Sequence, residues 1–163
     1  MQVQKQSKIQ QLCQQLETVY NKFCIDKGMT SKSKPGPAAS ESEIETFEKE
    51  AGFKLPPSFR EFISLHNGWQ KCAGELLILP LKKQLEMAKQ AAKQGSESQQ
   101  FHLIGMQSEM MVLLMRGSAS SDGEMKIQLI LNADGETEEL PHFTALLDRL
   151  MLSLNMLADQ AKK

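Results

Sequence analysis

The stretch "SESEIETFEKEAGFKLPPSFREFISLHNGW", Ser40–Trp69, predicts two short helices whose ends are clearly marked. Ser40 is followed three residues later by Glu43, and this S-x-x-E spacing is the capping box that begins a helix. Gly52 ends the first helix, because glycine readily adopts the left-handed conformation found just past many helix ends. The apolar stripe of this helix consists of Ile44, Phe47 and Ala51.

The second helix of this stretch begins at the Pro56-Pro57 pair. A proline in the first turn costs no hydrogen bond, because that N–H has no partner within a helix. The sequence Asn67-Gly68 ends the helix, and Trp69 follows directly. The side chains spaced to face one side are Phe59, Phe62, Ile63 and His66.

On the N-terminal side, residues 3–25 repeat apolar residues at steps of three and four, which predicts an amphipathic helix within residues 1–26. The glutamines of this segment could also belong to a prion-like tract, but the helical period favours the ordinary helix. Residues 27–39 are rich in Gly, Pro, Ser and Lys, which predicts an internal loop.

On the C-terminal side the apolar period changes, and short apolar runs predict strands at 75–80, 101–105, 109–116, 124–132 and 136–140. Helices are expected at 81–95 and from Phe143 onward. Residues 96–100 read as a loop and "NADG", 132–135, as a tight turn. The chain is therefore expected to be one α+β domain over 1–163, with a mainly antiparallel meander of about four to six strands covered by helices. The expected core includes Phe47, Phe59, Phe62, Leu65, Leu77, Leu129, Leu146 and Leu150.

The opening stretch resembles the signature of the SUKH superfamily, in which an acidic helix and a Gly precede a pattern of the form xLPxxaxxFhxxhNG. The matching positions are Ser40, Ile44, Phe47, Glu50, Gly52, Leu55, Pro56, Phe59, Phe62, Leu65, Asn67 and Gly68. "HFTALL", 142–147, is similar to the closing helix of the family. The resemblance implies a scaffold with its function on the surface, as in the bacterial immunity proteins and fungal cell-wall-assembly regulators of that superfamily.

The composition and charge of the chain argue against a membrane or nucleic-acid partner. The net charge is -1, there is one Trp and one Tyr, and no basic stripe with aromatic residues is present. No apolar run approaches the roughly 20 residues that span a bilayer, and the N-terminus resembles no signal peptide, so a cytoplasmic protein is expected. Cys13, Cys24 and Cys72 are odd in number and lack CxxC spacing, which favours three reduced thiols.

The sequence contains no recognisable motif for catalysis, cofactor binding or metal binding. We therefore expect no catalytic, cofactor-binding or metal site, and we do not expect the protein to be an enzyme. His66, His102 and His142 lack ligand spacing with each other or with Cys. The carboxylates of "SESEIETFEKE" are expected on a solvated helix face. "NADGETEEL" fails as an EF-hand, because Ile130 and Pro141 would take its first and last ligand positions.

The predicted function is protein binding, and the resemblance to the SUKH superfamily implies, as the favoured interpretation, an immunity protein that neutralises a cognate toxin encoded nearby. The alternative is a regulatory or scaffolding protein of the cell-wall-assembly kind. Residues 101–163 contain five Lys/Arg and nine Asp/Glu, a net charge of -4, which suits a basic partner. The residues proposed to bind it are Asp122, Glu124, Asp134, Glu136, Glu138 and Glu139. The alternative is that they are ordinary turn residues and the charges of a protected edge strand.

Overall fold

The fold was analysed in a computed structural model that describes residues 6–30, 32–95, 100–131 and 134–161. Five α-helices lie in this part of the chain: α1 (Lys8–Asp26), α2 (Glu41–Ala51), α3 (Pro57–Leu65), α4 (Leu81–Lys93) and α5 (Phe143–Ala161). The strands are β1 (Lys34–Pro35), β2 (Trp69–Gln70), β3 (Leu77–Ile78), β4 (Phe101–Gln107), β5 (Met110–Met115), β6 (Ile127–Ile130) and β7 (Thr137–Leu140). No helix within these ranges has the length and apolar character needed to cross a bilayer.

The strands form one antiparallel sheet in the order β1-β2-β3-β4-β5-β6-β7, so each strand pairs with its neighbour in sequence. This confirms the α+β class and the antiparallel meander, with seven strands among the described residues instead of the four to six expected. The additional strands, β1 and β2, are two residues each, and β1 falls within the predicted loop 27–39. Such short pairings carry no alternating apolar pattern, so the sequence gives no sign of them.

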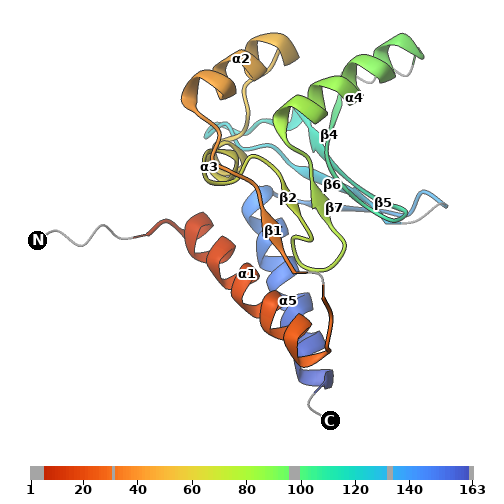
Figure 1. Cartoon of the computed structure of the whole chain (residues 1–163). Coiled ribbons are helices and arrows are strands. Elements are labelled where there is room, and N and C mark those ends of the chain that lie inside the picture. The colour runs from red at the N-terminus through yellow and green to blue at the C-terminus, as the bar shows by residue number, and fades with distance from the viewer. Residues whose placement is uncertain (1–5, 31, 96–99, 132–133, 162–163) are drawn as a thin grey trace, which may run out of the picture.

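The helices lie in two groups around the sheet (Figure 1). Helices α1 and α5 pack side by side, and α3 contacts both of them. Helix α2 contacts α3 and α4, and α4 packs on β4. Helix α3 therefore lies between the two groups and joins them into one core.

Most of the predicted core is confirmed. Phe47, Phe59, Phe62, Leu129 and Leu146 are buried, while Leu65 and Leu150 are partly buried against the core. Leu77 is only half-buried because the inward side of β3 is occupied by Ile78. The three cysteines are buried free thiols, as expected.

The predicted helix ends agree closely with the structure. Ser40 and Glu43 form the complete capping box of α2, and Gly52 follows the helix with a left-handed φ of 80°. Pro57 is the first residue of α3. Helix α1 begins at Lys8 after the Ser7 cap, five residues later than expected, and residues 1–5 lie outside the described ranges.

Two predicted connections fall partly on residues that the structure does not describe. Residues 96–99 of the loop predicted at 96–100 lie outside the described ranges, as do residues 132 and 133 of the turn predicted at 132–135. Gly95 directly precedes the first gap and Gly135 is the second residue after the other, with φ of 74° and 80°. Their left-handed backbones are those expected at a helix end and a tight turn.

The Asn67-Gly68 pair ends α3 and also contacts the start of α4. The side-chain oxygen of Asn67 accepts a hydrogen bond of 2.9 Å from the Leu81 N–H and so caps the start of α4, whose own preceding residue is Pro80. At Gly68, φ is 90° and a Cβ would lie 2.9 Å from Pro80. Glycine is therefore required here both by the backbone conformation and by the close approach of Pro80.

Candidate functional site

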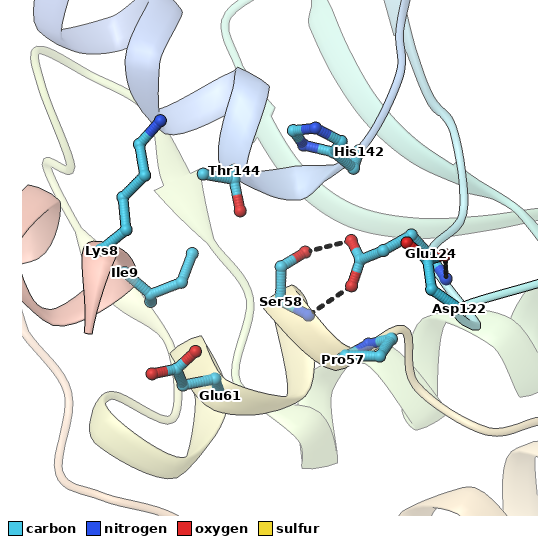
Figure 2. Close-up of a pocket in the computed structure, with 9 residues that line it drawn as sticks. All are labelled: Lys8, Ile9, Pro57, Ser58, Glu61, Asp122, Glu124, His142 and Thr144. Atoms are coloured by element: carbon cyan, nitrogen blue, oxygen red, sulfur yellow. Dashed lines mark hydrogen bonds between the residues drawn. The ribbon is translucent and has the colours of Figure 1, made fainter. Parts of the chain in front are cut away.

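An acidic hollow with a volume of about 490 Å³ opens between α1, α3, the β5–β6 loop and the start of α5 (Figure 2). Its carboxylates come from Glu61 on α3 and from Asp122 and Glu124 in the loop. The other lining residues are Lys8, Ile9, Pro57, Ser58, His142 and Thr144. We call this feature the acidic hollow.

The wall of the acidic hollow is fixed by Glu124 and Ser58. One oxygen of the Glu124 carboxylate accepts from the Ser58 N–H at 2.7 Å, and the other accepts from the Ser58 hydroxyl at 2.6 Å. Pro57 has no N–H, so the Ser58 N–H is the first donor that α3 presents at its start. A carboxylate in this position satisfies that donor and interacts favourably with the helix dipole.

The loop that carries Glu124 is held by its own hydrogen bonds. Asp122 accepts from the Ser120 hydroxyl and, at 3.0 Å, from the Glu124 N–H. These bonds, first the one from Ser120, lower the pKa of Asp122 below its usual value. Gly123 has φ of 86°, and a Cβ there would lie 3.5 Å from the Pro57 ring, so the loop comes close to α3 at this residue.

His142, which also lines the acidic hollow, caps a helix. Its Nδ1 accepts a hydrogen bond of 3.1 Å from the Ala145 N–H and so caps the first turn of α5. Because Nδ1 is the acceptor, the proton of the neutral ring is on Nε2. At the rim, Lys8 of α1 pairs with Asp148 of α5 at 3.1 Å, and this ion pair joins the starts of the two helices.

The acidic hollow is suited to holding a positively charged group. Asp122 is exposed and Glu61 is half-buried, and Glu61 makes no side-chain hydrogen bond or ion pair with any residue that the structure describes. Lys8, the one Lys or Arg among the described residues that line the hollow, already has a carboxylate partner. Within the described ranges, no group of three or more His, Cys, Asp or Glu could hold a metal ion.

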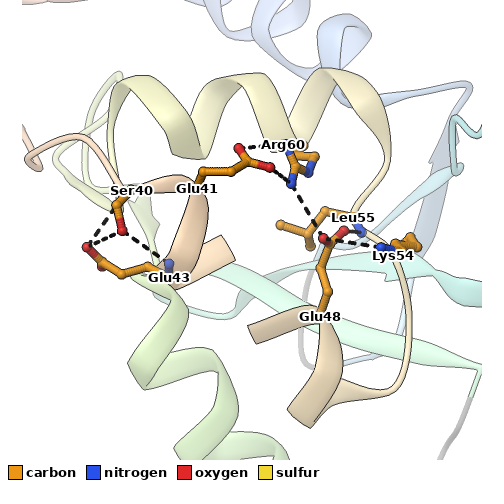
Figure 3. Close-up of polar contacts among 7 residues, drawn as sticks. All are labelled: Ser40, Glu41, Glu43, Glu48, Lys54, Leu55 and Arg60. Carbon is orange, nitrogen blue, oxygen red and sulfur yellow. Dashed lines mark hydrogen bonds and ion pairs between the residues drawn. The ribbon is translucent and has the colours of Figure 1, made fainter. Parts of the chain in front are cut away.

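The polar contacts of the opening stretch form a separate network that joins α2 to α3 (Figure 3). Glu48 is 5% exposed, and one of its oxygens accepts a hydrogen bond of 2.8 Å from the Leu55 N–H. Its other oxygen lies 3.6 Å from a guanidinium nitrogen of Arg60, which is itself hydrogen-bonded to Glu41. The expectation that every carboxylate of this helix is solvated was therefore wrong for Glu48, because the chain after Gly52 folds back over that side of α2.

These contacts show that the polar residues of Ser40–Trp69 shown in Figure 3 stabilise the packing of α2 against α3.

Residues 38–149 match the SMI1 / KNR4 family (SUKH-1). The chain belongs to this family. None of the curated proteins compared with the chain matches it.

The SUKH-1 match covers the chain from just before the α2 capping box to the first turns of α5. Helix α1 and α5 beyond residue 149 lie outside it. The acidic hollow therefore has most of its lining within the family match, and α1 adds Lys8 and Ile9 from outside it.

The six acidic residues predicted to bind a partner do not form one surface. Asp122 and Glu124 precede β6 and line the acidic hollow, whereas Asp134 and Glu136 follow β6 and are exposed at its other end. The loop before a strand and the turn after it are separated by at least the strand's length, which for the four residues of β6 is roughly 13 Å.

The two acidic residues on β7 already have cationic neighbours. Glu138 pairs with Arg149 of α5, and Glu139 pairs with Lys126 at 2.9 Å. Glu138 and Glu139 therefore contribute less uncompensated negative charge than their number suggests.

Several residues of the acidic hollow could not be found from the sequence. Ser58 and Glu124 are 66 positions apart, and no local pattern joins them. The one available signal was the Pro56-Pro57 start of α3, which provides no side-chain cap and so requires an acceptor from elsewhere. That signal indicates the need for a cap but not which of the carboxylates supplies it.

Proposed function

We propose that this SUKH-1 protein is a non-enzymatic binding domain, and that it acts as an immunity protein that binds and neutralises a toxin encoded nearby. The observation that carries the proposal is the family match over residues 38–149. The resemblance of the Ser40–Trp69 signature to superfamily members that include bacterial immunity proteins supports the same reading.

The acidic hollow is the surface that we propose for the toxin. It is concave, its wall is fixed by the Glu124–Ser58 contact, and the carboxylates of Glu61 and Asp122 remain accessible within it. A negatively charged surface increases the rate at which a basic partner is encountered, and a concave one can enclose a projecting Arg or Lys side chain. A toxin that acts on nucleic acids or nucleotides needs a basic site to bind phosphate, and such a site suits this surface.

The test of function is a toxin-protection assay with the neighbouring gene. We expect deletion of the gene for this chain to be tolerated only when the neighbouring toxin gene is also deleted, and the two purified proteins to form a complex. A deletion phenotype that persists without any toxin gene would reject the immunity role and favour a regulatory or scaffolding protein instead.

The test of the surface uses two charge-reversal variants matched in the number of charges. One carries Glu61→Lys and Asp122→Lys in the acidic hollow, and the other carries Asp134→Lys and Glu136→Lys at the far end of β6. Glu124 is kept, because it caps α3. We expect the first variant to associate with the toxin at least about tenfold more slowly at low salt. The second should associate nearly as the unmodified protein does, and the reverse ranking would place the toxin at the β6–β7 turn.

A further inference from the structure

One face of the sheet is turned away from the helices and is nevertheless apolar. On the inner face, Phe47 of α2 and Gln84 of α4 contact His102. Arg149 of α5 pairs with Glu138 on the same inner face. The hydrophobic residues of the outer face on β3 to β6 are half-buried or exposed, and none is among the partly buried residues that pack against the core. We call them the outer apolar face: Leu77, Phe101, Leu103, Met106, Met111, Leu113, Met115 and Ile130.

The strand register places these side chains on one continuous surface. Residues directly opposite each other in paired strands point to the same face, with Cβ atoms about 5 Å apart. A register shift between Leu103 and Gly105 keeps Met106 on the same face as Leu103. The rows across the outer face are Phe101 with Met115, then Leu103 with Leu113, Gln128 and Glu139, then Leu77 with Met106, Met111, Ile130 and Thr137.

Strands β4 and β5 have the composition of strands covered on both faces. An antiparallel sheet with one face in water normally alternates apolar and polar residues. Strand β5, "MMVLLM", contains no polar residue, and β4 presents only Phe101, Leu103 and Met106 on its outer side. Contiguous apolar patches with a polar rim mark sites of interaction. We therefore expect another surface to cover the outer apolar face.

The rest of the outer face is polar and carries little uncompensated charge. Strands β6 and β7 present Gln128, Thr137 and Glu139 beside Ile130. Within strands β3 to β7, the one charged side chain on the outer face is Glu139, and it pairs with Lys126 at 2.9 Å. The face is thus apolar over β3, β4 and β5 and polar over β7, with β6 between them. This is the pattern of an interface with an apolar centre and a polar rim.

The two ends of the outer face differ in charge. Glu109 in the β4–β5 turn and Asp134 and Glu136 in the β6–β7 turn are exposed at one end of the strands. Lys126 lies at the other end, just before β6. The other charged residues near that end turn toward the helices: Arg116 contacts the end of α2, and Asp122 and Glu124 line the acidic hollow.

We infer that the outer apolar face packs against the same face of a second copy of this chain. Two sheets with the same twist pack face to face about 10 Å apart, with their strands within about 30° of each other. A two-fold axis allows one surface to be its own partner. The axis lies across the strands along the row that contains Leu113. Each apolar strand then faces the same strand of the other copy, and the polar strands meet at the rim.

This axis also separates the acidic turns. The end that carries Glu109 and Asp134 in one copy lies over the end that carries Lys126 in the other, so opposite charges approach each other. An axis along the strands would bring the acidic turns of both copies together and would place apolar β3 and β4 against polar β6 and β7. The outer face is therefore complementary to itself in one arrangement, which favours a second copy as the occupant over an unrelated protein.

The predicted dimer is weak and independent of the proposed immunity function. Four strands about 4.8 Å apart and three rows roughly 7 Å apart give a face of roughly 20 by 20 Å, which is small compared with the interfaces of stable complexes. Dimerisation is therefore reversible and depends on protein concentration. The acidic hollow lies among α1, α3 and α5 on the helix side, so it stays open in the dimer.

Sedimentation equilibrium of the full chain without any toxin, over about a hundredfold range of concentration, tests the inference. We expect monomer and dimer in reversible exchange. Leu113→Lys places two ammonium groups opposite each other at the axis and should raise the dissociation constant at least about tenfold. Ile25→Lys, which replaces an exposed hydrophobic residue of α1, is the matched control and should leave it unchanged. Circular dichroism and the urea midpoint check that each variant is folded.

A second measurement locates the axis. Gln128→Cys places a thiol in the row that contains the axis, whereas the native cysteines are buried. Oxidation should link two copies of this variant. Thr137→Cys, on the same face but in the next row, should be linked much less, because the two copies of this residue lie on opposite sides of the axis. A protein that stays monomeric throughout, equal effects of the two lysine variants, or equal linking of the two cysteine variants would overturn the inference, including the case in which a different protein covers this face.

Discussion

The carboxylate of Glu124 accepts two hydrogen bonds from Ser58, one from the Ser58 N–H at 2.7 Å and one from the Ser58 hydroxyl at 2.6 Å. Because Pro57 offers no N–H, this contact supplies the cap that α3 lacks in its own sequence. It also fixes the β5–β6 loop against α3 and thereby gives the acidic hollow its shape.

Removal of this cap should destabilise the fold. We expect Glu124→Ala to lower the free energy of unfolding by about 0.5–2 kcal/mol, the range typical of lost helix caps. Ser58→Ala removes only the hydroxyl bond and should cost about 1 kcal/mol. Urea denaturation of both single variants and of the double variant gives the interaction free energy between Glu124 and Ser58. This energy should be clearly non-zero, because the two residues are in contact. Glu109→Ala, at an exposed position, is the control, and a Glu124→Ala midpoint equal to that of the control would contradict the cap.

Glu48 should matter more for stability than any exposed carboxylate of α2. Glu48→Ala leaves the buried Leu55 N–H without its 2.8 Å acceptor and removes the anion beside Arg60, so we expect a loss of about 2–3 kcal/mol. Glu45→Ala, on the exposed side of the same helix, should stay within about 0.5 kcal/mol of the unmodified protein. Thermal and urea unfolding compare the two, and similar losses for both variants would show that the Leu55 contact contributes little.

The parts of the fold that the sequence could predict depend on local chemistry. The capping box at Ser40, the left-handed Gly52 and the proline start of α3 each act within a few residues, and all three are present. The parts that it could not predict depend on distant partners. Asn67 caps α4 from 14 positions away, Glu124 caps α3 from 66 positions away, and Glu48 is covered by chain that the helical pattern does not include.

The difference between local and distant contacts also explains which features of the candidate site could be predicted from the sequence. The acidic residues could be recognised because charge is a property of the residue itself. Their arrangement could not be predicted from composition, because it depends on which end of β6 each residue occupies. Asp122 precedes β6 and Asp134 follows it, so the two residues lie at opposite ends of this strand. A count of acidic residues in the C-terminal third therefore combined two separate surfaces into one.

The three thiols should react slowly in the native protein. Burial raises the pKa of Cys13 to about 12, with the charge of Glu61 adding to the effect, and it raises the pKa of Cys72 well above its usual value. Since the thiolate is the reactive form, alkylation at pH 8 should be at least about tenfold slower in native protein than in urea. Mass spectrometry should find three modified cysteines after unfolding without reduction. Rapid native alkylation, or fewer than three modified residues, would show an open structure or a disulfide.

His102 should make the fold less stable in mild acid. The ring is 6% exposed, it packs against Phe47 and Phe53, and its Nε2 hydrogen-bonds the Gln84 oxygen at 2.9 Å. Burial, with a further contribution from the Arg116 charge, lowers its pKa to about 4 from the usual 6.5. Between these two values the unfolded chain binds a proton that the folded chain does not, so the free energy of unfolding falls as the pH falls from about 6.5 toward 4.

This dependence can be measured and assigned to one residue. The limiting slope for a single group is about 1.4 kcal/mol per pH unit, so the loss over the whole window is roughly 3 kcal/mol. Urea midpoints between pH 7 and pH 4.5 at constant ionic strength should decline for the unmodified protein and for His66→Gln, whose residue is half-buried. In His102→Gln the decline should be much flatter, even if the variant is less stable at pH 7, because the amide does not titrate. Parallel declines in all three proteins would show that other groups, and not His102, bind the protons that unfold the chain.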